Sequence, residues 1–277
     1  MDLDLPHAGG VSWSVCVRDD AGMPLGSVAA RVAMRTASVG KVLLLLEAAR
    51  AMSVGELGAR EPLTRTDADR VADSGLWHTL AVDTLPATDV AALVGAVSDN
   101  LATNVLLRRV GLDAVAGTAA DLGLHETALH DRVRDERGPD DAATLSSGTA
   151  AELSDLAHRI MHESALGPAA DSLVREWLSA NTDQSMVGAA FVAHGGLDPL
   201  AHHVSLSHDL LYWNKTGSER GVRADIGSVS RNGSTVSWAA IANWEASEEP
   251  SATERMRPWS VLRGMHLIGE QILDSLP

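Results

Sequence analysis

The sequence contains a single cysteine, Cys16, among its 277 residues. One thiol cannot form a disulfide within the chain, and no cluster of cysteine and histidine has the spacing of a structural zinc site. Cys16 lies in an alternating apolar run, so we expect it to be an inert residue of the core. The sequence thus excludes an intrachain disulfide and implies neither a metal nor an organic cofactor.

Basic residues are also scarce. Lysine and arginine total 22 against 37 aspartates and glutamates, which gives a formal net charge of −15 at pH 7. A nucleic-acid groove needs clustered basic side chains that bind phosphates and release counterions. We therefore expect no nucleic-acid partner, and we take the acidic surface to mean mainly solubility.

Two kinds of targeting segment are missing. The N-terminus MDLDLPHAGG is acidic where a secretory signal needs basic residues. No apolar run reaches the roughly 18 residues that span a membrane. The sequence therefore predicts a cytoplasmic protein with no membrane partner, although a secreted chain trimmed of its leader would look the same.

Alternating apolar residues predict strands near both ends of the chain. The pattern covers residues 11–18 and 27–34, and it returns at 212–215, 222–230 and 236–243. Asn232-Gly233 is a typical hairpin turn. The segments between them have helical periodicity and end signals; they are 38–52, 87–97, 100–110, 112–122, 148–162 and 169–180, followed by a final helix at about 257–274.

Strands at both ends with helices between them predict an α+β fold. We expect an antiparallel five-stranded sheet flanked by helices, with an inserted all-α lobe. The chain is long enough for one large domain whose two lobes share a core. The expected division of residues 1–277 is a sheet lobe of about 1–35 and 205–277 and an all-α lobe of about 36–204. Ligand sites favour the seam between such lobes.

Three short motifs occur in order along the chain. They are S-V-G-K at 38–41, S-D-N at 98–100 and K-T-G at 215–217. The first alone is weak, because a serine three positions before a lysine is common by chance. The three together, each on its expected element, match the set of the β-lactamase and penicillin-binding fold. The chain therefore resembles the class A β-lactamases and penicillin-binding DD-peptidases.

Ser38 and Lys41 have a direct chemical interpretation. Ser38 begins the most apolar helix, where free N–H groups favour developing negative charge, and Lys41 follows one turn later. A serine hydroxyl needs an adjacent base, and an amine desolvated in a dry seam can accept its proton. The alternative is a capping serine and a lysine whose stem lies along the core.

The resemblance implies further site residues. Ser98 would pass the proton to the leaving group, and Asn100 would bind a substrate amide. Lys215, Thr216 and Gly217 would hold the acyl group and its carboxylate at a strand edge. The N–H groups of Ser38 and Ser218 would form the oxyanion hole.

The likeness extends over about residues 11–275. The 60-residue separation of the first two motifs is like that of the class A enzymes. The stretches SDNLATNVLLRRVG at 98–111, WLSANT at 177–182 and WNKTGS at 213–218 resemble the corresponding family segments. Trp77 falls where the family carries a residue at the cleft mouth, so it is a candidate wall, or else a core residue.

One family motif is absent. Class A β-lactamases carry E-x-x-L-N in a long loop, where the Glu and Asn hold the water that releases the acyl-enzyme. The loop at 132–147 (RVRDERGPDDAATLSS) lacks it and offers Asp135 and Glu136, with Asp131 just before it. Either Glu136 or Asp135 would then replace the family's Glu as the base; the alternative for Glu136 is a solvated loop charge.

The sequence thus predicts a serine hydrolase that forms an acyl-enzyme at Ser38 and acts on a β-lactam or a related small amide or ester, as a monomer. The alternatives are a slowly deacylating DD-peptidase or esterase, and a non-catalytic binding or biosynthetic accessory protein of the same fold. Four histidines before K-T-G have no helix-face spacing such as H-x-x-x-H, so we expect surface roles for them; they are His194, His202, His203 and His208.

Overall fold

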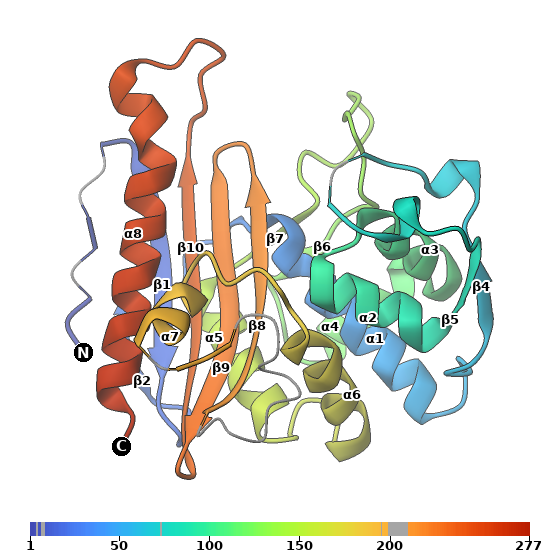
Figure 1. Cartoon of the computed structure of the whole chain (residues 1–277), viewed down its shortest axis with the longest axis horizontal. Helices are drawn as coiled ribbons and strands as arrows, with labels where there is room; N and C mark the ends of the chain where they lie inside the picture. The colour runs from blue at the N-terminus through green and yellow to red at the C-terminus, as the bar shows by residue number, and fades with distance from the viewer. Residues whose placement is uncertain (4, 7–8, 73, 195, 199–209) are drawn as a thin grey trace.

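The computed structural model describes residues 1–277 except 4, 7–8, 73, 195 and 199–209. Its centre is an antiparallel sheet with the strand order β2-β1-β10-β9-β8 (Figure 1). The predicted α+β fold with a five-stranded sheet is confirmed. The strands are β1 (Val11–Arg18), β2 (Pro24–Val28), β8 (Leu210–Glu219), β9 (Val222–Arg231) and β10 (Ser234–Trp244).

Turn chemistry decides where these strands end. Asn232 and Gly233 have φ angles of 50° and 81°, as the predicted tight turn between β9 and β10 requires. The prediction of a strand at 27–34 is wrong over most of its length. The strand ends at Val28, because Ala29 adopts a φ of 43° that turns the chain away from β1.

The two faces of the sheet pack against different helices. On β10, Trp238 and Ala240 join the apolar cluster of α8 (Ala252–Ser275) and α7 (Gly188–His194). The alternate residues Ala239 and Ile241 join the cluster of α5 (Ala150–Met161) and the other helices. Successive strand residues point to opposite faces, so one sheet serves both cores.

A helix buried on every side lies at the centre of the other half of the molecule. This helix, α1 (Lys41–Ser53), is buried at ten of its thirteen residues, because it carries apolar side chains on every face. It packs against four helices (Figure 1). These are α2 (Ala87–Val97), α3 (Asn100–Val110), α4 (Leu112–Asp121) and α6 (Pro168–Ser179).

Short elements that the sequence did not indicate connect these layers. Strands of two or three residues are too short to show periodicity. They form the sheets β3-β7-β6 and β4-β5. The elements are β3 (Met34–Arg35), β4 (Pro62–Thr64), β5 (Thr84–Pro86), β6 (Ala128–Leu129) and β7 (Ser146–Gly148), with 3₁₀ turns at Ala37–Gly40 (η1), Asp67–Asp69 (η2) and Trp77–Thr79 (η3).

Among the residues that the structure describes, no helix combines the length and the apolar character needed to cross a membrane.

Candidate active site

Ser38 lies in the turn η1, directly before α1, and its side chain is half-buried. The preceding residue, Ala37, has a φ of 48°, an uncommon conformation for a residue with a Cβ. The hydroxyl of Ser146 holds this turn by donating to the carbonyl of Ala37 at 2.5 Å. The strand β7, which carries Ser146, therefore fixes the backbone that presents Ser38.

Lys41 is fully buried at the beginning of α1. Its Nζ lies 2.7 Å from the carbonyl oxygen of Ser98, 2.7 Å from Oδ1 of Asn100 and 3.2 Å from the hydroxyl of Ser98. The S-x-x-K and S-D-N motifs, about 60 positions apart in the sequence, therefore meet around one amine.

Ser98 joins α2 to α3 and has a left-handed backbone, with a φ of 54°. Its hydroxyl lies 3.2 Å from Nζ of Lys41 and 3.0 Å from Nζ of Lys215. Its carbonyl accepts hydrogen bonds from Lys41 and from the hydroxyl of Ser74. The Ser98 hydroxyl thus bridges the two lysines.

The aspartate of S-D-N has a positioning role. Asp99 is fully buried, and its carboxylate accepts from the backbone N–H groups of Leu76, Trp77 and Ala102. The third of these bonds caps α3. Asp99 therefore fixes both the start of α3 and the neighbouring turn.

The side chain of Asn100 contacts both Lys41 and the loop before S-D-N. Its Oδ1 accepts from Lys41, and its Nδ2 donates to the carbonyl of Ala72 at 3.1 Å. A carboxamide nitrogen carries two N–H groups, and the carbonyl of Ala72 accepts one of them.

Lys215 is the second buried lysine, and the sequence contains no third. Burial lowers the pKa of Lys215 to about 8, although the carboxylates of Asp183 and Asp225 act in the opposite direction. Its Nζ also donates to the carbonyl of Thr216 at 2.7 Å. The Thr216 hydroxyl itself donates to Asp183 at 2.7 Å.

Gly217 allows β8 to lie directly against the turn of Ser38. A Cβ at this position would come 2.2 Å from the carbonyl oxygen of Thr36 and 3.0 Å from the backbone nitrogen of Ser38. No other residue fits without moving backbone atoms. The next residue, Ser218, is exposed.

A buried polar network connects β8 to the neighbouring strand β9 and to Val187. Asp225 on β9 accepts from the backbone N–H of Val187 at 2.9 Å and from the side chain of Asn214 at 3.3 Å. Burial raises the pKa of Asp225 to about 7, against the opposing effect of the Val187 hydrogen bond. Sequence reasoning missed this residue; the available signal was that Asp225 is the one acidic residue of β9.

The carboxylates of the loop differ in their surroundings. Glu136 is exposed. Asp131 lies 2.6 Å from Arg134 and 2.7 Å from Arg137. Burial alone would raise the pKa of Asp131, but hydrogen bonds from the two arginines outweigh it and hold the pKa below its usual range. Asp135 accepts from the backbone N–H of Ala72 at 2.8 Å.

Trp77 is a core residue, which is the second of the two roles that the sequence left open, rather than a wall of the cleft mouth. Its side chain is fully buried, and its ring N–H donates to the carbonyl of Val82 at 3.0 Å. The backbone bond to Asp99 turns this residue inward. Leu76 beside it is the exposed apolar side chain of the turn.

Comparisons with known proteins agree with this fold. The model of a family described as "Beta-lactamase enzyme family" matches residues 5–257. A β-lactamase from Sphaerobacter thermophilus superposes with a TM-score of 0.78 at 21% identity, covering 95% of this chain and 91% of its own. PBP-A gives 0.76 at 19%, with 98% and 93% covered.

An ancestral class A β-lactamase (GNCA) gives a TM-score of 0.76 at 20% identity, with 97% of this chain and 95% of its own covered. At these identities the likeness concerns the fold. Comparison with curated proteins finds no significant match.

Proposed function

The chain belongs to the beta-lactamase enzyme family, and from that premise we propose that it is a serine hydrolase that forms an acyl-enzyme at Ser38. The proposed substrates are β-lactams or related small amides and esters. The observation that carries the proposal is the bridge from Lys41 through the Ser98 hydroxyl to Lys215. It provides a base and a proton path beside the turn of Ser38.

The position of Lys41 suits a base. Its Nζ lies 3.2 Å from the Ser98 hydroxyl, and the same hydroxyl lies 3.0 Å from Nζ of Lys215. Two ammonium groups on either side of one hydroxyl would repel each other, which favours one neutral lysine.

Each step of acylation then has a residue. Lys41 takes the proton of the Ser38 hydroxyl while the Ser38 oxygen attacks the carbonyl carbon of the substrate, and a tetrahedral oxyanion forms. The backbone N–H groups of Ser38 and Ser218 stabilise this oxyanion. The proton passes through Ser98 to the leaving nitrogen or oxygen, whose bond to carbon breaks. The side-chain amide of Asn100 binds the substrate amide, and Lys215 attracts the substrate carboxylate.

The experiment is intact-protein mass spectrometry after brief exposure to benzylpenicillin and to a fluorophosphonate. We expect one adduct per chain, and its loss in Ser38→Ala. Ser147→Ala is the matched control, because Ser147 lies 2.8 Å from an imidazole nitrogen of His130 and is a second serine with a base beside it. Persistent label in Ser38→Ala, or no label with either probe, would refute the proposal.

A second candidate is slow deacylation, with the protein acting as a penicillin-binding peptidase or esterase. Its support is that Glu136 is exposed and that Asp131 is bound by two arginines. A carboxylate with a lowered pKa is a poor base at neutral pH. A stoichiometric burst with nitrocefin followed by slow turnover favours this candidate, whereas steady rapid turnover that Glu136→Gln abolishes favours a β-lactamase.

A further inference from the structure

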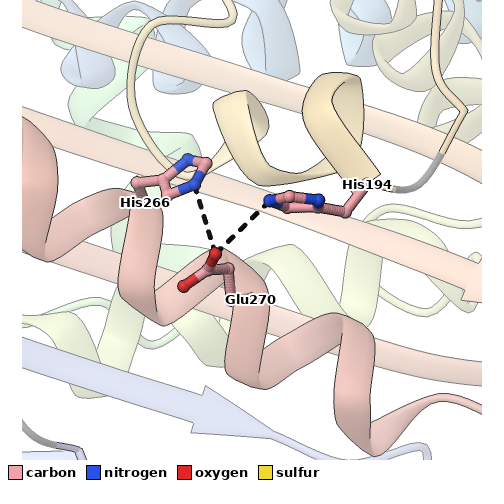
Figure 2. A group of neighbouring side chains, drawn as sticks. All are labelled: His194, His266 and Glu270. Atoms are coloured by element: carbon pink, nitrogen blue, oxygen red, sulfur yellow. Dashed lines mark ion pairs between the residues drawn. The ribbon is translucent and has the colours of Figure 1, made fainter.

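A group of metal-ligating side chains lies away from Ser38, on the helices of the opposite sheet face. It consists of His194 at the end of α7 and of His266 and Glu270 on α8 (Figure 2). One ligand atom from each of the three lies within 4.8 Å of the others. We propose that these residues bind a divalent transition-metal ion, with Zn²⁺ as the ion that fits best.

The distances suit a metal better than hydrogen bonds. Oε1 of Glu270 lies 3.4 Å from Nε2 of His194 and 3.4 Å from Nε2 of His266. A hydrogen bond from an imidazole N–H to a carboxylate is normally about 2.7–3.2 Å long. Bonds of about 2.0–2.1 Å to a tetrahedral Zn²⁺ place neighbouring ligand atoms about 3.3 Å apart. Both distances match such an edge.

The donor set selects the class of ion. Two imidazoles and one carboxylate suit Zn²⁺ and its first-row neighbours, while Ca²⁺ and Mg²⁺ prefer oxygen ligands throughout. Three protein ligands leave a fourth tetrahedral position for water.

The backbone fixes two of the ligands and brings the third close. His266 and Glu270 are four residues apart on α8 and therefore share one face of that helix. Helix α7 packs tightly against α8 at Gly269, where a Cβ would come 2.4 Å from the carbonyl oxygen of Val187 and 2.7 Å from Cβ of Ala190.

His194 is the adjustable ligand. Its side chain is 58% exposed, so its ring can rotate to complete the site without moving packed atoms.

The sequence analysis did not identify this site. His194 belongs to the histidines for which we expected surface roles, and its partners lie on another helix. The other three, His202, His203 and His208, lie outside the described residues and are not part of the proposal. The available signal was H-x-x-x-E at 266–270.

A bound ion would connect the end of α7 to α8. Val187, just before α7, donates to Asp225 behind β8. If the ion binds the folded chain and not the unfolded chain, it raises the free energy of unfolding by RT ln(1 + [M]/Kd).

The test is a Zn²⁺ titration of the EDTA-treated and dialysed full chain against a chromophoric chelator. We expect one ion per chain and a rise in melting temperature with Zn²⁺. His266→Ala and Glu270→Ala should each weaken binding by about 100-fold or more, since even outer partners of a metal site contribute about 10–100-fold.

His162→Ala is the matched control. His162 also lies near an imidazole, with 4.4 Å between its ring centroid and that of His158, and near the carboxylate of Asp20 at 3.7 Å. This variant should bind Zn²⁺ like the wild type. Unchanged affinity in His266→Ala, or no stoichiometric binding, would overturn the proposal. His194→Ala, at an exposed position, provides the same test if an α8 variant does not fold. None of these measurements depends on the activity of Ser38.

Discussion

Lys215 donates to the hydroxyl of Ser98 at 3.0 Å, although 117 positions separate the two residues in the chain. The contact joins the edge strand β8 to the junction of α2 and α3. Because Lys41 lies 3.2 Å from the same hydroxyl, removing any one of the three residues leaves the other two without the bridge.

Removal of the Lys41 amine should slow acylation without preventing substrate binding. We expect Lys41→Met to reduce the rate of Ser38 labelling by about 10²–10⁴-fold, the usual cost of losing a general base. Stopped-flow measurement with a fluorescent penicillin separates this rate from affinity. A loss of affinity at an unchanged limiting rate would contradict the role of Lys41 as base.

The lowered pKa of Lys215 predicts the pH dependence of an acidic substrate. Below about pH 8 the side chain is an ammonium ion and attracts a carboxylate; above it the charge is lost. The value of kcat/KM should therefore fall as the pH rises through about 8, rather than near 10.5. An uncharged ester should show a smaller fall.

Lys215→Arg provides the control for this profile, because an arginine stays charged throughout the range. The fall near pH 8 should disappear in this variant even if its overall rate is lower. An equal fall for both substrates, or a fall that remains in Lys215→Arg, would argue against the assignment.

Asp225 predicts a pH-dependent loss of stability. Its pKa is about 7 in the folded chain against 3.8 ordinarily, so the folded state binds more protons between these values. The free energy of unfolding should therefore decrease as the pH rises from about 4 to 7. With a fully buried carboxyl group, the loss is on the order of a few kcal/mol.

Thermal unfolding over this pH range measures the effect. In Asp225→Asn the slope should be reduced, since the amide oxygen can still accept from Val187 but no proton is lost. Asp135→Asn is the comparison, because this carboxylate lies on an exposed loop residue. A wild-type slope that persists in Asp225→Asn would show that another group is responsible.

The sequence predicted those parts of the fold that local signals determine. Helices α2 and α3 begin and end where the pattern placed them, because the left-handed Ser98 and the capping Asp99 separate them. The first hairpin was misjudged at Ala29, whose positive φ has no residue-type signal.

Contacts between distant segments determine the side-chain positions in the site that the sequence could not predict. The three motifs predicted that Lys41, Ser98 and Lys215 would meet, and these residues are in contact. Trp77 is held inward by a backbone hydrogen bond to Asp99, 22 positions away. The side chains of α7 and α8 come together only through helix packing, which no short motif records.

Both lysines of this chain are fully buried, and every other permanently cationic side chain is an arginine. Apart from the N-terminal amine, amine-directed chemistry therefore has targets only in the candidate site. Amine-directed reagents, which modify many surface lysines on most proteins, should modify the amines of the folded chain little beyond its N-terminus. Any additional modification of Lys41 or Lys215 then measures how often solvent enters between β8 and α1.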